Sequence, residues 1–104
     1  MGSKKASSYQ FSSKVWLYPG QNAAWHFVRV PKKLSREIQT RYEGMTRGWG
    51  SFPVDATVGK TTWKTSIFPD KKSGTFLLPL KASVREKEGI RVNITIQISL
   101  TVRI

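Results

Sequence analysis

Residues 47–69 read Arg-Gly-Trp-Gly-Ser-Phe-Pro-Val-Asp-Ala-Thr-Val-Gly-Lys-Thr-Thr-Trp-Lys-Thr-Ser-Ile-Phe-Pro, and this stretch decides the fold. Its larger part predicts a β-hairpin, because two alternating runs, 52–58 and 61–68, flank a turn at Gly59-Lys60. Apolar and polar side chains take turns along both runs, as in strands with one buried side. Pro69 is expected to close the second strand.

The C-terminal segment carries the longest alternation in the chain. Every even position from Ile90 to Ile104 is aliphatic, and the odd positions between them are polar or basic. This pattern predicts a strand with one buried side and one side in water. A straight strand of that length would span about 50 Å. We therefore expect either a bend near Asn93 or a strand end that reaches another chain.

Three shorter strands are expected upstream of that segment, over 14–18, 25–30 and 75–81. Pro or Gly follows the first two, which indicates where they end. Pro79 removes one backbone donor from the third, so we expect an edge strand or a bulge there. Residues 1–13 are polar and rich in Ser and Lys, and we expect a flexible leader with a tag-like beginning.

Helical spacing occurs once, where Leu34, Ile38 and Tyr42 recur at every fourth position. This predicts a helix of two turns, with Ser35 as its N-cap and Gly44 at its end. A further helical turn is expected over 81–88.

About six strands and one or two short helices predict a small, mainly β domain over residues 14–104. We expect a closed barrel and not an open sheet, because closure removes exposed strand edges.

The chain is strongly basic, with 18 Lys and Arg against 6 Asp and Glu and a net charge of +12. Such an excess favours a nucleic acid or another anionic ligand as partner. The alternative is that the charge is spread over all faces and serves solubility alone. Cysteine is absent, which is typical of a reducing, cytoplasmic location. No apolar run approaches the roughly 18 residues that span a bilayer, so we expect no membrane partner.

The residue types needed for catalysis and metal binding are scarce. His26 is the only histidine, and a lone strand histidine is more often structural than a metal ligand. Neither a nucleophile elbow nor a complete phosphate-binding glycine loop occurs. We therefore expect no metal, no cofactor and no enzymatic activity.

Basic residues next to aromatic ones supply the candidate contacts for a nucleic acid or other ligand, namely Arg29, Arg47, Trp49, Lys64 and Arg85. Trp49 lies between two glycines, so its ring could stack on a base or fold back as a lid over the core. We favour the lid. Trp63 and Trp25 are expected in the core.

Five motifs follow one another in the order seen in a known family. They are Lys-Val-Trp-Leu-Tyr-Pro-Gly (14–20), Ala-Trp-His-Phe-Val-Arg-Val-Pro (24–31), Arg-Gly-Trp-Gly-Ser-Phe-Pro-Val (47–54), Thr-Thr-Trp-Lys-Thr-Ser-Ile-Phe-Pro (61–69) and Leu-Leu-Pro-Leu-Lys-x-x-Val-Arg (77–85). Over about residues 14–100 the chain resembles the domain of unknown function 1905 family. The resemblance implies a small double-split β-barrel, distantly similar in architecture to the barrels of AbrB-type transcription factors. Some members are fused to a bacteriocin-protection domain.

The resemblance supplies no activity, cofactor or site residue. The chain departs from the family at Asn93-Ile94, where the family usually has a Gly-Asp turn. Asn tolerates a left-handed backbone, whereas Ile is no turn residue, so the last hairpin is expected to be altered or the last strand straighter.

Three hypotheses for function follow. The first is a non-enzymatic binding or accessory module, and the second is a nucleic-acid-binding protein with a basic, aromatic face. The third is a small-ligand pocket at the barrel mouth, rimmed by Trp49 and Arg47. The length of the last strand leaves a homodimer open.

Overall fold

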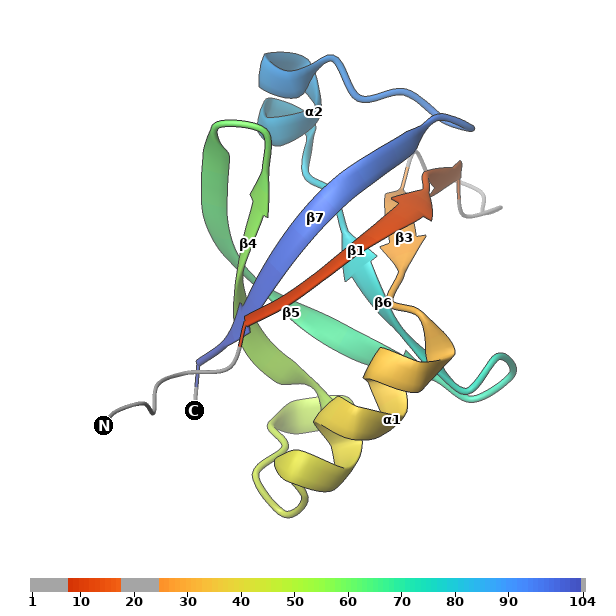
Figure 1. Ribbon diagram of the computed structural model, residues 1–104, viewed down its shortest axis with the longest axis vertical. Coiled ribbons are helices and arrows are strands. Elements are labelled where there is room, and N and C mark those ends of the chain that lie inside the picture. The colour runs from red at the N-terminus through yellow and green to blue at the C-terminus, as the bar shows by residue number, and fades with distance from the viewer. Residues whose placement is uncertain (1–7, 18–24, 104) are drawn as a thin grey trace.

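The computed structural model describes residues 8–17 and 25–103. Strands predominate, and two short α-helices and one 3₁₀ turn complete the fold (Figure 1). The elements are β1 (Ser8–Lys14), β2 (Trp16–Leu17), β3 (His26–Arg29), α1 (Lys32–Arg41), η1 (Gly48–Gly50), β4 (Phe52–Val58), β5 (Thr61–Asp70), β6 (Thr75–Pro79), α2 (Ala82–Glu88) and β7 (Thr95–Val102).

Within the described ranges, seven strands form one antiparallel sheet in the order β1-β7-β4-β5-β6-β3-β2. The sheet curls into a half-barrel, with the long β5 crossing from one half to the other (Figure 1). The closed barrel that we expected is not observed. β1 pairs along its length with β7, and β2 pairs with β3. Between β1 and β3, the described residues form a side-chain hydrogen bond from Ser13 Oγ to the Arg29 carbonyl at 2.8 Å.

The predicted flexible leader is wrong for residues 8–13, which belong to β1. All seven residues of β1 pair with β7, from Ser8 opposite Thr101 to Lys14 opposite Thr95. Alternation explains the strand, since Tyr9 and Phe11 are buried while their neighbours face water. Polar composition concealed this short pattern. Residues 1–7 lie outside the described residues, as do 18–24, which contain the predicted end of the first strand.

The central hairpin is confirmed. β4 and β5 pair from Phe52 opposite Ile67 to Val58 opposite Thr61, and Gly59 in the turn has a φ of 60°. A side chain at Gly59 would also meet the Glu88 carboxylate of α2, so close approach adds to the need for glycine. β5 continues through Pro69 to Asp70, so Pro69 does not end it as we predicted.

The predicted helix is present as α1, but Ser35 does not cap it. Pro31 occupies the N-cap position, and Ser35 is buried one turn inside the helix. Its hydroxyl donates to the Val30 carbonyl at 3.0 Å and accepts from the Phe76 amide at 3.0 Å. Since the Val30 amide donates to the Phe76 carbonyl at 2.8 Å, the hydroxyl completes a pair between Val30, which directly follows β3, and Phe76 in β6.

The predicted bend near Asn93 is confirmed, and the last strand is correspondingly short. Asn93 has a φ of 76°, and β7 starts two residues later. The Asn93 amide donates to the Val15 carbonyl at 2.8 Å, and the Val15 amide donates to the Ile94 carbonyl at 2.9 Å. The Asn93-Ile94 turn is therefore bound to the residue that joins β1 and β2, and the straighter strand is excluded.

The predicted edge position of the strand that contains Pro79 is wrong, because β6 lies between β5 and β3. Pro79 is the last residue of β6 and lies opposite Phe27. The next residue restores the ladder, since the Leu80 amide donates to the His26 carbonyl at 2.9 Å. Pro79 has no amide hydrogen, but neither neighbouring strand requires one at this position. The pairing of β6 with β5 ends at Leu77, and the Leu80 amide makes the hydrogen bond to the chain of β3.

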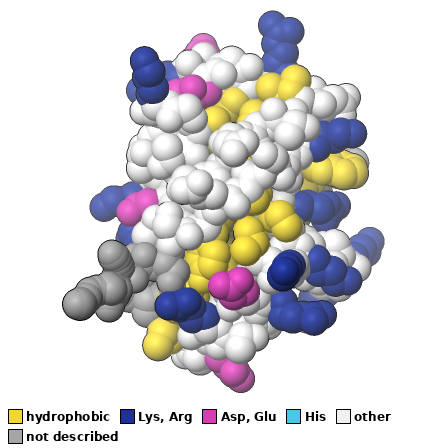
Figure 2. Space-filling view, viewed as in Figure 1, with side chains coloured by type: hydrophobic (Ala, Val, Ile, Leu, Met, Phe, Trp, Pro, Cys, Tyr) yellow, Lys and Arg dark blue, Asp and Glu magenta, His cyan; other side chains and the backbone are white. Residues whose placement is uncertain are grey.

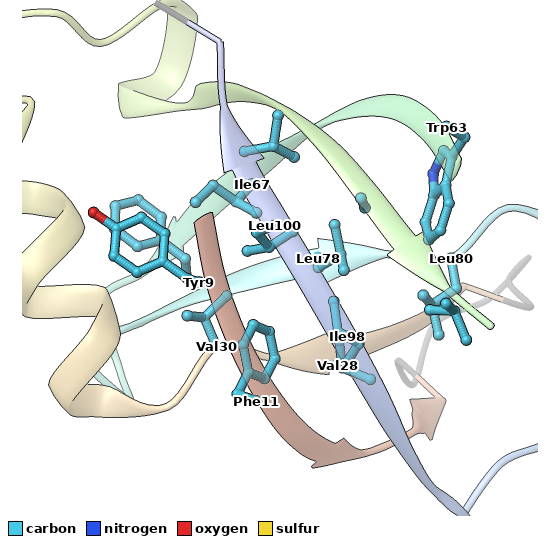
Figure 3. Close-up of a cluster of buried hydrophobic side chains, with 14 of the residues drawn as sticks. Tyr9, Phe11, Val28, Val30, Trp63, Ile67, Leu78, Leu80, Ile98 and Leu100 are labelled. Atoms are coloured by element: carbon cyan, nitrogen blue, oxygen red, sulfur yellow. The ribbon is translucent and has the colours of Figure 1, made fainter. Parts of the chain in front are cut away.

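The core fills the inside of the curled sheet. Side chains from β1, β3, β5, β6 and β7 point toward one another there (Figure 3). The alternation in β7 is confirmed, because Ile98, Leu100 and Val102 are buried. Each large apolar side chain that is fully buried contributes about 1.5–3 kcal/mol to folding.

Candidate functional site

The outward side of β2, β3, β6 and β5 carries three aromatic side chains, of which Trp16 and Phe68 are exposed and Phe27 is buried. Trp16 pairs with Phe27, and Phe27 pairs with Pro79. Leu77 pairs with Arg29 on one side and with Phe68 on the other. Directly opposite residues lie on the same side of a sheet, so these residues form one surface, which we call the aromatic face. Its members are Trp16, Phe27, Arg29, Phe68, Asp70, Leu77 and Pro79.

A groove of about 330 Å³ adjoins the aromatic face and is lined by basic side chains; we call it the cationic groove. Lys64 comes from β5, Lys81 directly precedes α2, and Arg85 lies in α2, where its Nε donates to the Leu80 carbonyl at 3.0 Å. The residues described along this groove include no Asp or Glu. Three formal positive charges therefore converge on one hollow without a carboxylate in its lining.

Two indoles also line the cationic groove. Trp25 was expected in the core and is 67% exposed instead. It precedes β3, so the alternation of that strand does not direct its side chain inward. Trp63 was expected in the core and is buried. Its Nε1 has no hydrogen-bond partner among the described residues, which leaves one buried donor unsatisfied.

Arg29 and Asp70 form an ion pair in the middle of the aromatic face. Arg29 Nη1 lies 3.1 Å from Asp70 Oδ2, and its guanidinium lies 5.0 Å from the Trp16 ring centroid. Ser73 Oγ donates to the same carboxylate oxygen at 2.7 Å. The hydrogen bond from Ser73 is the largest cause that lowers the pKa of Asp70. The hydrogen bonds from Arg29 and from the Lys72 backbone lower the pKa further, as does the positive charge of Arg29. Together these effects outweigh partial desolvation, which raises the pKa. The carboxylate is thus held ionised and neutralised by a neighbour.

Trp49 is presented to solvent by a strained turn. The predicted lid over the core is wrong, because Trp49 is 90% exposed. Its φ is 63°, a left-handed value that is costly for a residue with a side chain. Hydrogen bonds across the turn hold it, from the Arg47 amide to the Ser51 carbonyl at 2.8 Å and from Ser51 Oγ to the Gly48 carbonyl at 2.8 Å.

Trp49 lines a second hollow of about 720 Å³, which we call the indole groove. Phe68 and Asp70 of β5 line it too, together with Lys71 of the following turn. Buried rings of Phe52 and Phe76 contribute to its lining. Gln39 of α1 and Thr46 add uncharged polar groups. The indole groove therefore combines an exposed ring with aromatic walls and hydrogen-bonding groups.

The five candidate contact residues are divided between two places. Lys64 and Arg85 meet in the cationic groove, and Trp49 lies at the indole groove. Arg29 lies on the aromatic face, where it pairs with Asp70 and stacks on the rings of Trp16 and Phe27. Arg47 is exposed and lines none of the described grooves; its backbone holds the Trp49 turn. Of the two residues predicted to rim a small-ligand pocket, Trp49 lines a described groove and Arg47 does not.

Sequence reasoning missed Lys81, Phe68 and the exposure of Trp25. Alternation in β5 was a usable signal for Phe68, because 64, 66, 68 and 70 fall on one side of a strand. No comparable signal existed for Lys81. Only the fold brings the start of α2 next to β5.

The structure describes no group of three or more His, Asp or Glu side chains that could hold a metal ion. None of the helices in the described ranges is both long and apolar enough to cross a membrane.

A protein-family description, the domain of unknown function DUF1905, matches residues 11–100. The matched range runs from β1 into β7 and includes every residue of both grooves. No curated protein matches the chain.

Proposed function

Since the chain belongs to the DUF1905 family, whose description names no activity, we propose that it is a non-enzymatic module that binds a phosphate-bearing ligand in the cationic groove. The observation that carries the proposal is the convergence of Lys64, Lys81 and Arg85 on a hollow whose described lining contains no acid. Like charges that converge without a counter-ion repel each other, so the arrangement is stabilised when an anion binds.

The chemistry of the groove favours phosphate carried by a flat ring. Lysine and arginine side chains bind phosphate through charge-assisted hydrogen bonds, and arginine adds a planar fork. The exposed indole of Trp25 lies in the same lining and offers a stacking surface for a base. A mononucleotide supplies both parts, so it is the simplest probe of this site.

The test is calorimetric titration with adenosine 5′-monophosphate at low salt. We expect the double variant Lys64→Gln/Lys81→Gln to weaken binding about ten-fold or more, which corresponds to the loss of charged hydrogen bonds worth roughly 1.5–3 kcal/mol. Both lysines are exposed, so the variant should fold.

The matched control removes two charges elsewhere. Lys33 and Arg36 lie on exposed positions of α1, outside the cationic groove. We expect Lys33→Gln/Arg36→Gln to change the affinity less than two-fold after correction for salt. Equal losses in both double variants would mean that net charge alone attracts the nucleotide, and the proposal would be wrong.

The absence of enzymatic activity is part of the same proposal. It is supported by the single histidine and the lack of a catalytic motif. His26 lines the cationic groove, so turnover of a phosphate ester that disappears in His26→Ala would overturn it. A cytoplasmic location is proposed from the absence of cysteine.

We also propose the double-split barrel that the family resemblance implies. It is supported by one feature of the strand order: Val15 alone separates β1, at one end, from β2, at the other. A single extended segment thus joins the two edges of the curled sheet.

A further inference from the structure

The cationic groove and the indole groove are connected by a third hollow. This middle hollow, of about 380 Å³, lies on the aromatic face and is lined by apolar residues that include Leu77. It shares Trp25 and Pro79 with the cationic groove, and it shares Phe68, Pro69 and Asp70 with the indole groove. The three hollows therefore adjoin one another through shared lining residues, from the cationic groove over the aromatic face to the indole groove, and we call this series the track.

We propose that this track binds single-stranded nucleic acid, with a phosphate in the cationic groove and successive bases stacked toward Trp49. The proposal rests on the proposed function at its cationic end and names the ligand class for the whole track. It goes beyond a mononucleotide site because it assigns roles to Phe68 and Trp49, which the cationic groove does not contain.

Exposed aromatic rings are spaced along the track. Trp25 is 67% exposed at one end, Phe68 is 39% exposed in the middle, and Trp49 is 90% exposed at the other end. Large aromatic side chains usually enter the core, so three exposed rings that line adjoining hollows require an explanation. Proteins that bind single strands use such rings as stacking surfaces, because every base has a flat face.

The charges along the track match a phosphate backbone. Lys64, Lys81 and Arg85 lie at one end and Lys71 lies at the other. Asp70 is the only acid among the described residues that line the three hollows, and Arg29 neutralises it. In the view of Figure 2, Lys and Arg side chains also gather over α1 and the turn between β5 and β6. They extend the positive field around the indole end.

The strain at Trp49 supports a role for its ring. A left-handed backbone is readily accepted by glycine, and glycines flank this position on both sides. The chain nevertheless carries the largest side chain there and leaves it in water. Strained positions of this kind concentrate at ligand-binding sites, where the surrounding hydrogen bonds maintain them.

The length of the track suits a short oligonucleotide. Lys64 and Asp70 both lie on the outward row of β5, and their positions in the strand place them roughly 20 Å apart at the rise of a β-strand. Small β domains of the OB-fold type cover about 4–16 nucleotides of single strand. A duplex hides the faces of its bases within the stack, so it can use the cations of the track but not the rings.

The experiment measures fluorescence anisotropy of labelled ten-nucleotide oligothymidylate, with a duplex of equal length and adenosine 5′-monophosphate as competitors. We expect the oligonucleotide to bind at least ten-fold more tightly than the mononucleotide, with affinity that falls steeply as salt rises. Trp49→Ala and Phe68→Ala should each weaken oligonucleotide binding about five-fold or more, because stacking on one ring is lost.

The same two variants should leave mononucleotide binding in the cationic groove within two-fold of the native protein. Gln97→Ala, at an exposed position of β7 outside the three hollows, is the control substitution and should change neither affinity. Melting curves of all variants confirm that each is folded. Binding of oligonucleotide that survives Trp49→Ala and Phe68→Ala unchanged would overturn the track.

The outcomes separate the two proposals. If the mononucleotide binds and the Lys64→Gln/Lys81→Gln variant loses it, while the ring variants keep full oligonucleotide affinity, the cationic groove is supported and the track is wrong. If the ring variants bind the oligonucleotide more weakly but the double lysine variant does not, the proposed phosphate site in the cationic groove is wrong. Tighter binding of duplex than of single strand would overturn the track directly.

Discussion

The two halves of the curled sheet obey the same alternation but present different chemistry to solvent. The outward side of β1 and β7 carries Ser, Thr and Gln almost throughout, namely Ser8, Gln10, Ser12, Thr95, Gln97, Ser99 and Thr101. Figure 2 shows much of this side as a band without charged side chains. The aromatic face, on β2, β3, β6 and β5, instead combines rings with an ion pair and adjoins a basic groove.

Burial of the inward residues therefore does not explain why the aromatic face carries exposed rings. Both halves bury their inward residues in one core, so both could have carried small polar residues outside. Short hydroxyl and amide side chains are readily solvated, which makes the β1–β7 side unremarkable for a small domain. Exposed rings cost solvation, and their presence along adjoining hollows is the reason that we propose a ligand for this face.

The largest expected effect concerns the connection that holds β3 against β6 beneath the aromatic face. We expect Ser35→Ala to lower the free energy of unfolding by about 2 kcal/mol, because the buried Phe76 amide would lose its acceptor. Urea unfolding followed by circular dichroism measures the change. Ser12→Ala, on the exposed side of β1, is the matched control and should cost less than about 0.5 kcal/mol. Equal costs would mean that the Ser35 hydroxyl does not join the strands.

The next effect concerns the turn that leads into β7. Asn93→Val should destabilise the protein by about 1.5 kcal/mol, since a β-branched residue resists the φ of 76° at this position. Asn93→Gly should be nearly neutral. The midpoints of thermal unfolding of the three proteins are compared under one condition. A valine variant as stable as the native protein would show that the turn is not left-handed in solution.

Relief of strain at Trp49 should be smaller and of opposite sign. Trp49→Gly removes the cost of a left-handed backbone, about 1–2 kcal/mol, but adds chain entropy of roughly 0.5–1 kcal/mol to the unfolded state. We therefore expect stability to be unchanged or raised by up to about 1.5 kcal/mol, as measured by denaturant unfolding. A clear loss of stability would indicate that the ring packs against the protein, contrary to its exposure.

The smallest expected effect involves the ion pair in the aromatic face. The pKa of Asp70 is lowered in the folded state, so its interactions stabilise the protein above the ordinary aspartate pKa of about 3.9 and are lost as pH falls through the depressed value. Asp70→Asn should cost about 0.5 kcal/mol at pH 7, because the pair is partly exposed. The melting temperatures of variant and native protein should converge as the pH falls below about 4. A difference that persists unchanged into acid would contradict this assignment.

Local patterns predicted the parts of the fold in which neighbours in sequence suffice. The hairpin of β4 and β5, the position of α1, the turn of α2 ended by Gly89 and the alternation of β7 all follow from spacing and turn chemistry. The bend at Asn93 was predicted from the implausible length of a straight strand. β1 was missed because its apolar residues, Tyr9 and Phe11, are too few to stand out from the surrounding serines.

The candidate site could be predicted only in fragments. Lys64, Arg85 and Trp49 were named from basic residues near aromatic ones, yet the pattern could not say that the first two share one groove and the third lies elsewhere. Arg29 was named as a candidate contact without its ion-pair partner, because Asp70 lies 41 residues away in sequence. Trp25 was assigned to the core and Trp49 to a lid over the core, because ring size is a guide to burial on average and not at a given turn.

The amino-acid sequence by itself determined that this is a mainly β, strongly basic domain with a central hairpin, because alternation, turn residues and charge are local properties. Tertiary structure alone decided that the sheet curls without full closure and that Ser35 joins two strands. It also decided which aromatic rings remain in water beside which cations. Those outcomes depend on contacts between residues far apart in the chain, and no local spacing records which distant side chain will be the neighbour.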